Sequence, residues 1–221
     1  MFGWNISSFI QNLIYLLPAI LIALSIHEFA HAFVAYKMGD ITQKERGRLS
    51  LNPLAHIDIT GLLCLMLFQF GWAKPVQVDT YYFSDKKQGL VWSSIAGPVV
   101  NLIAGFIFVF LYYLFIKLGL YTYDSGMIMT YIMDLFVMSA MINIGLGVFN
   151  LLPIPPLDGS KVLISILPER FYFQIIRYEQ YLAMILLFVL ILGVLDGPLM
   201  YARGTILGWF DALSRMLLGM G

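Results

Sequence analysis

Charged residues and cysteine are scarce in this chain of 221 residues. Lys, Arg, Asp and Glu make up only 12% of it, whereas they form about a quarter of an average soluble protein. The 13 basic and 13 acidic residues cancel, and no basic run stands out, which argues against nucleic acid as a partner. The single cysteine, Cys64, excludes an internal disulfide and a zinc site built from cysteines.

Apolar residues form 60% of the chain, and its mean hydropathy is +0.84. A soluble domain of this length cannot bury so much apolar surface. The composition therefore predicts a mainly α, polytopic membrane helix bundle that lies in a lipid bilayer. The first apolar segment lacks the basic stretch that precedes a cleaved signal peptide, so we expect it to be retained as a membrane span.

A membrane span needs about 20 apolar residues, and this criterion predicts four full spans, at 9–36, 88–117, 127–150 and 174–195. Segment 57–71 is apolar but short and bounded by glycine, which favours a re-entrant or interfacial element. Segment 199–219 mixes charges with tryptophan and leucine, which predicts an interfacial amphipathic helix or a sixth helix of the bundle. The connection between the first two spans contains prolines and alternates weakly, so short strands or extended loops are expected there.

Basic residues are concentrated in two of the connections. Seven of the 13 lie between the first and second spans: Lys37, Lys44, Arg46, Arg48, Lys74, Lys86 and Lys87. Three more lie between the third and fourth: Lys161, Arg170 and Arg177. Short loops rich in Lys and Arg face the cytoplasm. The N-terminus is therefore predicted to lie outside, and both basic connections inside.

Two of the three histidines of the chain lie within the first apolar segment, in HEFAH (27–31). On a helix, His27 and His31 share one face with Cβ atoms about 6 Å apart, so both can bind one zinc ion. Glu28 lies about 100° around the helix, where it reaches the water on the metal as a general base. The alternative is a structural histidine pair with Glu28 in an internal salt bridge. Ionisable groups at this depth cost about 2.5 kcal/mol or more each, which favours a functional site.

A third ligand can come from NLLPIPPLDG (150–159), which follows the third span on the same predicted side of the membrane. Its prolines forbid a regular helix, and irregular backbone at membrane depth is tolerated only inside protein or along a wet cavity. Asp158 then begins a new helical segment. Its carboxylate can complete a His-His-Asp zinc site with a fourth position open to water, or it can serve only as a helix N-cap.

HEFAH, AGPVVN (96–101) and NLLPIPPLDG together resemble the site-two protease family of intramembrane zinc metalloproteases. The resemblance covers about residues 15–170. GRLSLNPLAHID (47–58) and WAKPVQVD (72–79) are similar to the compact members that carry no PDZ or CBS domain.

The resemblance implies a three-helix catalytic core with one Zn²⁺ per chain. His27, His31 and Asp158 then bind the metal, and Glu28 activates the water. The substrates are transmembrane segments of other proteins, including membrane-tethered regulators, and an edge strand at 71–83 is expected to hold the unwound segment. The expected organisation is one integral-membrane protease domain over 1–221, with its core at about 9–170 and C-terminal helices at 171–221. The expected location is a cell membrane, with the active site near the cytoplasmic side.

Three polar residues are further candidates for contact with the substrate or the transition state. Asn101 can donate to a peptide carbonyl, or it can form a hydrogen bond between helices. Asn150 can bind an extended substrate strand or cap freed backbone groups. His56 can stabilise the tetrahedral intermediate, approach the metal, or be an ordinary loop histidine. Asp134, within the third span, either lines a polar path or pairs structurally.

Two other functions fit an intramembrane zinc site. The first is a multi-pass metal transporter, although such proteins usually show repeated halves with matching broken helices, and none is visible here. The second is a non-catalytic zinc scaffold. A structural zinc site is closed by a fourth protein ligand, and without a cysteine only His56 could supply it.

Overall fold

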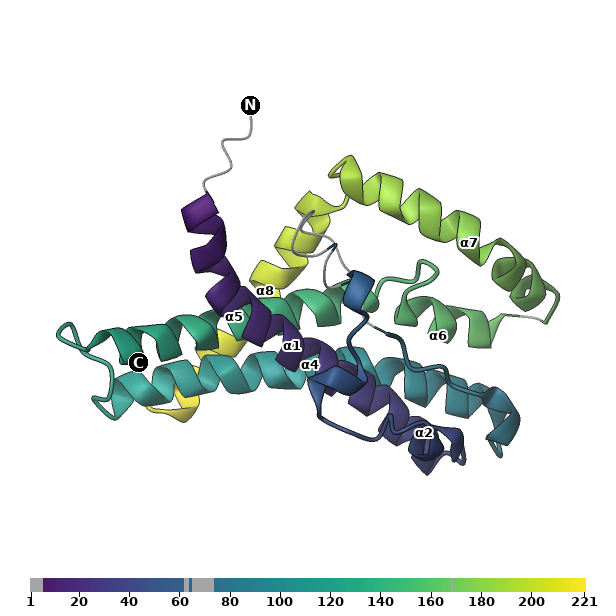
Figure 1. The fold of residues 1–221 in the computed structure, drawn as a ribbon, viewed down its shortest axis with the longest axis horizontal. Helices are drawn as coiled ribbons and strands as arrows, with labels where there is room; N and C mark the ends of the chain where they lie inside the picture. Colours follow the sequence, from purple (N-terminus) through teal and green to yellow (C-terminus); the bar gives the residue numbers. More distant parts are fainter. Residues whose placement is uncertain (1–5, 62–63, 65–73, 168) are drawn as a thin grey trace.

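A computed structural model describes residues 6–61, 64, 74–167 and 169–221. The described chain is mainly α-helical (Figure 1), which confirms the predicted fold class. Three helices are long and apolar enough to cross a membrane: α1 (Ile6–Lys37), α4 (Lys86–Lys117) and α5 (Met127–Asn150). They correspond to the first three predicted spans.

Local sequence signals set the ends of these helices. Asp85 caps α4, because its carboxylate accepts from the backbone amides of Lys87 and Gln88. Gly119 follows the C-terminus of α4 with a φ of +69°, a left-handed conformation that glycine adopts without strain. α5 begins after Gly126 and ends three residues before Pro153. The loop between α4 and α5 is therefore short, and the two helices run antiparallel side by side (Figure 1).

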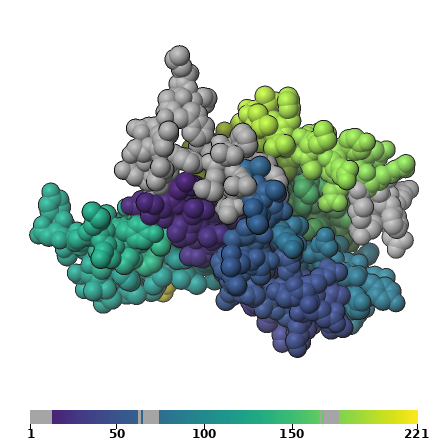
Figure 2. Space-filling model, viewed as in Figure 1, coloured from purple at the N-terminus to yellow at the C-terminus, as the bar shows by residue number. Residues whose placement is uncertain are grey.

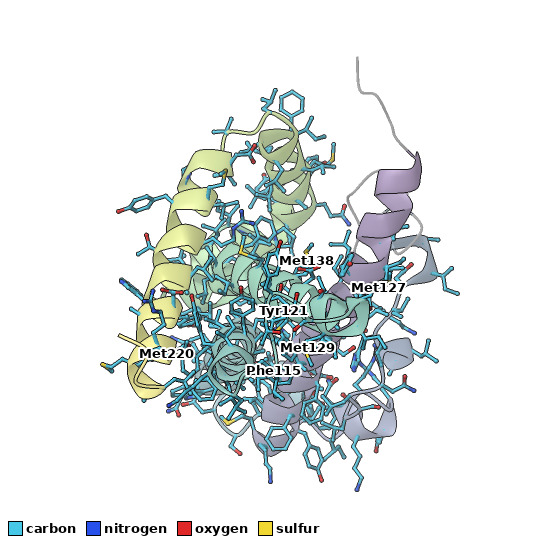
Figure 3. All side chains as sticks on the ribbon, turned by 90° about the vertical axis from the view of Figure 1, so that its left-hand side faces the viewer. Phe115, Tyr121, Met127, Met129, Met138 and Met220 are labelled. Atoms are coloured by element: carbon cyan, nitrogen blue, oxygen red, sulfur yellow. The ribbon has the colours of Figure 1, made fainter. Side chains whose placement is uncertain are left out.

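The core forms where α1 and α5 pack against α4. Small residues permit this close packing, as in other membrane helix pairs. A Cβ on Gly105 would lie 2.6 Å from the Ile144 side chain, and one on Gly147 would lie 3.0 Å from the Pro98 carbonyl oxygen. Figure 3 shows α1 and α8 (Asp196–Leu217) on opposite sides of the α4–α5 pair. Phe210 of α8 stacks edge-on against Phe106 of α4, with 5.5 Å between the ring centroids.

The fourth predicted span, 174–195, falls on α7 (Glu169–Ile191). The described residues hold up to four candidate spans, and the fourth is the pair formed by Arg177–Ile191 of α7 and α8, which join across a bend of 82°. The helix predicted at 199–219 exists as α8, and it packs against α4 and α5.

The connection between α1 and α4 contains helical turns and extended chain. It includes α2 (Thr42–Glu45) and the short 3₁₀ helices η1 (Pro53–Ala55) and η2 (Thr80–Tyr82). The predicted short strands do not form in the described part, which has one isolated bridge residue at Ile57, and extended loop alternates there with the helical turns. Most of segment 57–71 lies outside the described residues. In Figure 2 the described part, in blue, spreads over one end of the visible face.

Candidate metal centre

Three buried side chains from two distant parts of the chain converge at the centre of the helix bundle. His27 and His31 lie on α1, and Asp158 is the first residue of α6 (Asp158–Ile166). The Nε2 atoms of the two histidines are 3.0 Å apart. Asp158 Oδ2 lies 3.2 Å from Nε2 of His27 and 3.1 Å from Nε2 of His31. Each of the three side chains is at least nine-tenths buried.

This arrangement fits a zinc ion. A tetrahedral zinc ion with bonds of about 2.0–2.1 Å separates its ligand atoms by about 3.3–3.4 Å. The three observed separations, 3.0, 3.1 and 3.2 Å, are close to that value. Two imidazoles and one carboxylate are also a common ligand set for zinc.

The outer nitrogens of both histidines make hydrogen bonds that fix the tautomers. His27 Nδ1 donates to the side-chain oxygen of Asn101 over 2.6 Å, and His31 Nδ1 donates to the backbone carbonyl of Ser93 over 2.6 Å. Because both partners are acceptors, each Nδ1 carries the proton and each neutral ring turns a bare Nε2 lone pair inward. Two lone pairs and a carboxylate oxygen therefore face one another, and a cation is the group that satisfies all three.

Asn101 belongs to a buried network that ties α4 to both neighbouring helices. Its Nδ2 group donates to the Ala23 carbonyl over 3.1 Å and to Asn143 Oδ1 over 2.8 Å. Asn143 in turn donates to the Ser139 carbonyl of its own helix. Asn101 and Asn143 are fully buried, so breaking this network would leave polar groups without partners. Both hydrogens and the oxygen of the Asn101 amide are engaged, which favours the interhelical alternative over donation to a substrate.

Two glycines provide space for the cluster. A Cβ on Gly97 of α4 would lie 2.4 Å from His31 Nε2 and 2.7 Å from the His27 ring. A Cβ on Gly159 would lie 2.3 Å from the Leu151 carbonyl oxygen. Glycine at 97 therefore admits the imidazoles beside α4, and glycine at 159 brings the start of α6 onto the backbone at the end of α5.

Asp158 does not serve as an N-cap. The N-cap residue of α6 is Leu157, and no side chain caps the helix there. The second oxygen of Asp158, Oδ1, instead accepts from Lys161 Nζ over 3.0 Å. One oxygen therefore faces the histidines while the other is held by a cation one turn further along α6.

Glu28 is buried beside the cluster but is not one of its three members within the described residues. Its Oε2 atom accepts a hydrogen bond of 2.7 Å from the backbone amide of Val76. Val76 lies in an extended segment, 74–79, of the connection between α1 and α4. The structure thus gives Glu28 a backbone partner in place of the alternative salt bridge.

His56 and Asn150 lie outside the three-residue cluster in the described part of the chain. His56 is almost completely buried, and its Nε2 donates to the Ser50 carbonyl over 2.7 Å. Asn150 donates to the Leu146 carbonyl of its own helix over 3.1 Å. Both therefore make local hydrogen bonds.

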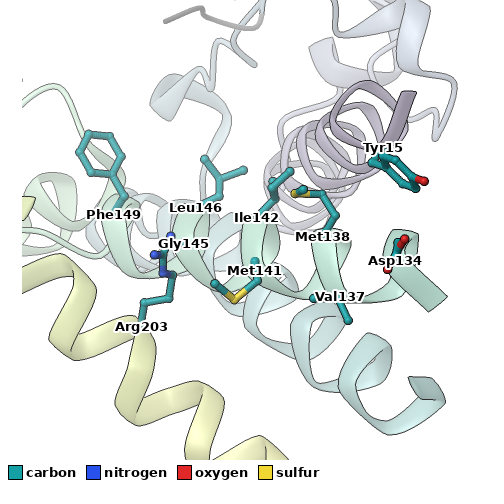
Figure 4. Close-up of a pocket in the computed structure, with 10 residues that line it drawn as sticks. All are labelled: Tyr15, Asp134, Val137, Met138, Met141, Ile142, Gly145, Leu146, Phe149 and Arg203. Atoms are coloured by element: carbon teal, nitrogen blue, oxygen red, sulfur yellow. The ribbon is translucent and has the colours of Figure 1, made fainter. Parts of the chain in front are cut away.

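Asp134 lines a cavity of about 730 Å³ along α5 (Figure 4). Arg203 of α8 and Tyr15 of α1 also line this cavity, and most of the remaining lining is apolar. None of the three residues of the cluster is part of its wall. Asp134 therefore lies at a second hollow, separate from the candidate metal centre.

Sequence reasoning missed the supporting partners of the site. Ser93 and Val76 contribute through backbone atoms, which no side-chain pattern reveals. Lys161 was counted for its charge alone, although its position three residues after Asp158 on a helix could have indicated an ion pair. Asn143 lies in none of the motifs that the sequence analysis identified.

Comparison with known proteins gives a consistent assignment. Residues 118–193 match the sequence profile of peptidase family M50. The protein named "Putative zinc metalloprotease YwhC", from Bacillus subtilis, is 38% identical over 211 residues, which cover 92% of this chain and 94% of that protein. No solved structure matches significantly.

Two more distant relatives carry names of the same type. Rip2 of Mycolicibacterium smegmatis is 30% identical over 162 residues, covering 71% of this chain and 58% of that protein. MJ0611 of Methanocaldococcus jannaschii is 31% identical over 139 residues, covering 62% of each chain. The chain, a membrane protein with several apolar helices, therefore belongs to peptidase family M50, the site-two protease family of zinc metalloproteases.

Proposed function

We propose that this protein is an intramembrane zinc metalloprotease that hydrolyses peptide bonds within transmembrane segments of other membrane proteins. One observation carries the proposal: two imidazole lone pairs and a carboxylate oxygen converge within 3.0–3.2 Å, inside a bundle of apolar helices. His27, His31 and Asp158 hold the zinc. When bound, zinc polarises a carbonyl group and lowers the pKa of water towards about 7.

Glu28 is the general base and then the general acid in this proposal. It is next to His27 on α1, it is buried, and its Oε2 atom is held by the Val76 amide. The other carboxylate oxygen, Oε1, accepts a proton from the attacking water and delivers it to the leaving amine nitrogen. A substrate helix must first unwind locally, because its carbonyls are engaged in i to i−4 hydrogen bonds.

Asn101 has a supporting role in this mechanism. By accepting from His27 Nδ1, it fixes the tautomer that turns Nε2 to the metal. The roles of His56 and Asn150 at the transition state stay predictions. The edge strand predicted at 71–83 does not form in its described part, where 74–79 is loop and 80–82 is η2, so binding of an unwound substrate by segment 74–79 stays a prediction without a strand. The basic connections support an N-terminus that lies outside and a site that lies towards the cytoplasm. We propose one protease domain, in which the C-terminal helices flank the core.

The experiment requires no knowledge of the substrate. Membranes from cells that express the wild type or Glu28→Gln are compared by mass spectrometry of protein N-termini, and both purified proteins are assayed for zinc. Glu45 is an exposed acid, so Glu45→Gln removes the same charge away from the site and serves as the control.

We expect one zinc per chain in all three proteins, with new termini inside transmembrane segments only for the wild type and Glu45→Gln. An unchanged set of termini in Glu28→Gln overturns the proposal. Zinc flux into proteoliposomes, with no new termini, would instead establish the transporter. Bound zinc with neither flux nor new termini would establish the scaffold.

A further inference from the structure

Segment 74–79 is held in place by the turn that follows α1. Four side chains of that turn form the 40–48 clamp: Asp40, Gln43, Arg46 and Arg48. Gln43 Nε2 donates to the Gln77 carbonyl over 2.8 Å, and Arg46 also reaches this oxygen, at 3.3 Å. Arg48 donates to the Lys74 carbonyl over 3.3 Å. The segment is thus attached at its start and in its middle.

Asp40 fixes the far end of the segment. Its Oδ2 atom accepts from the Asp79 amide over 2.9 Å and from Gln43 Nε2 over 2.7 Å. Its Oδ1 atom accepts from the amide and the hydroxyl of Thr42. Asp40 and Gln43 are completely buried, although both lie in a surface connection. Such a saturated buried carboxylate holds its partners firmly in place.

Between these attachments, Val76 donates its backbone N–H to Glu28. Glu28 lies nine residues before the end of α1 at Lys37, about 13 Å along the helix axis. Segment 74–79 runs in the opposite direction to α1, because the Asp79 amide is at Asp40 and the Val76 amide is at Glu28. The clamp therefore sets how far along α1 the Val76 amide lies.

We propose that segment 74–79 is a positioning element for Glu28, in which the Val76 amide holds the carboxylate and the 40–48 clamp holds the segment. The inference rests on the proposed role of Glu28 as the base. A glutamate side chain has three rotatable bonds, and one fixed oxygen restricts them while the other stays free for the proton. Asp40 and Gln43 are then positioning residues that act through Val76. Loss of the Val76 contact should lower kcat about 10- to 100-fold without changing zinc content.

A pair of proline variants tests the contact directly. Val76→Pro removes the donor to Glu28, whereas Val76→Ala keeps it. Val78→Pro places the same ring two residues further on, where the backbone amide donates to no other described residue. Each purified protein is assayed for zinc, thermal unfolding, and kcat and KM on a substrate found by the terminus comparison.

We expect a lowered kcat, with KM and zinc unchanged, for Val76→Pro only. Glu28→Gln and Glu28→Gln/Val76→Pro should be equally inactive, because both remove the same function. A wild-type kcat in Val76→Pro, with Glu28→Gln inactive, overturns the positioning role and leaves the proposed function intact. If Glu28→Gln cleaves like the wild type, the proposed function fails instead.

The clamp is tested with a matched pair of aspartate variants. Asp40→Asn puts an amide where Oδ2 accepts, while Asp79→Asn removes an equal charge from the segment and keeps its backbone N–H. We expect Asp40→Asn to lower kcat with KM and zinc unchanged, and Asp79→Asn to resemble the wild type. Equal kcat values for the two variants would contradict the proposal.

Hydrogen exchange gives a readout that does not depend on cleavage. Glu28→Ala removes the acceptor of the Val76 amide, and this amide should then exchange about 10- to 100-fold faster, as expected for loss of a hydrogen bond to a charged group. The Val78 amide serves as the internal reference and should not change. Asp40→Asn should also accelerate exchange at Val76. Wild-type exchange at Val76 in both variants would show that neither residue holds the segment.

Discussion

The candidate metal centre and the cavity along α5 both place ionisable side chains in the apolar bundle, but they treat these groups in opposite ways. At the centre, the outer nitrogen of each histidine and the second oxygen of Asp158 have hydrogen-bond partners, two from α4 and one from α6. Along the cavity, Asp134 is exposed and Arg203 half-buried, and neither has a salt-bridge partner among the described residues.

The presence of these partners distinguishes the ordered metal centre from the polar groups at the surface of the cavity. A buried polar group costs free energy unless it is paired, so a fully paired cluster persists only where the fold holds every partner in place. Asp134 lies about 10 Å from the start of α5, within reach of the membrane surface, and it avoids that cost by exposure. The comparison thus predicts large effects from small changes at the centre and small effects from charge removal at the cavity.

The largest effect is expected for Gly97→Ala. One methyl group would lie 2.4 Å from His31 Nε2 and displace the ligands. We expect less than one zinc per chain and a loss of cleavage of about 100-fold or more, measured by metal analysis and by the terminus comparison. Gly208→Ala on α8 is the control, because its Cβ meets nothing within 4 Å. Full zinc occupancy in Gly97→Ala would contradict the geometry of the centre.

The next effect is expected for Asn101→Leu, which keeps the approximate volume of the side chain but removes the acceptor of His27 Nδ1. Zinc affinity should fall about 10- to 100-fold, as for other partners that orient a ligand, and competition with a chelator measures this fall. Asn150→Leu should leave the affinity unchanged, because the side-chain hydrogen bond of Asn150 among the described residues is to its own helix. Equal zinc affinities for the two variants would show that Asn101 does not support zinc binding.

Asp40→Asn tests whether a carboxylate with a full set of hydrogen bonds also stabilises the protein outside the membrane spans. Burial acts to raise the pKa of Asp40, but hydrogen bonds from Thr42, the Asp79 amide and Gln43 outweigh it and hold the pKa below its ordinary value of 3.8. A lowered folded-state pKa stabilises the protein above the ordinary value and ceases to do so as the pH falls through the folded value. Asp40→Asn should therefore destabilise by about 1–3 kcal/mol at neutral pH.

Thermal unfolding in detergent at a series of pH values measures this effect. The difference between the wild type and Asp40→Asn should be constant near neutral pH and shrink once the pH is below 3.8. Asp79→Asn provides the control for loss of one charge. A difference that grows towards acid pH would have the wrong sign for a lowered pKa.

The smallest effect is expected for Asp134→Asn. The exposed carboxylate has no salt-bridge partner among the described residues. The free energy of unfolding should therefore change by less than about 0.5 kcal/mol, and zinc occupancy should not change. Arg203→Gln tests the other charged residue of the cavity in the same way. A loss of zinc in either variant would show that the two regions are coupled.

The membrane class, the spans formed by α1, α4 and α5, and the three residues of the buried cluster could be predicted from the sequence. Long apolar runs indicate spans because a bilayer requires about 20 such residues. HEFAH was informative because ionisable groups are expensive at membrane depth. The sequence did not predict the 82° bend between the Arg177–Ile191 part of α7 and α8, because a bend depends on packing and not on hydropathy.

The sequence by itself determined which residues could hold a metal, because only three histidines and few membrane-depth carboxylates are present. Only the tertiary structure decided that Asp158 meets His27 and His31 across more than a hundred residues of chain, and that Asn101 and Ser93 fix their tautomers. It also decided that Val76 holds Glu28. The physical reason is that these contacts use backbone atoms and distances between helices, and one-dimensional periodicity encodes neither.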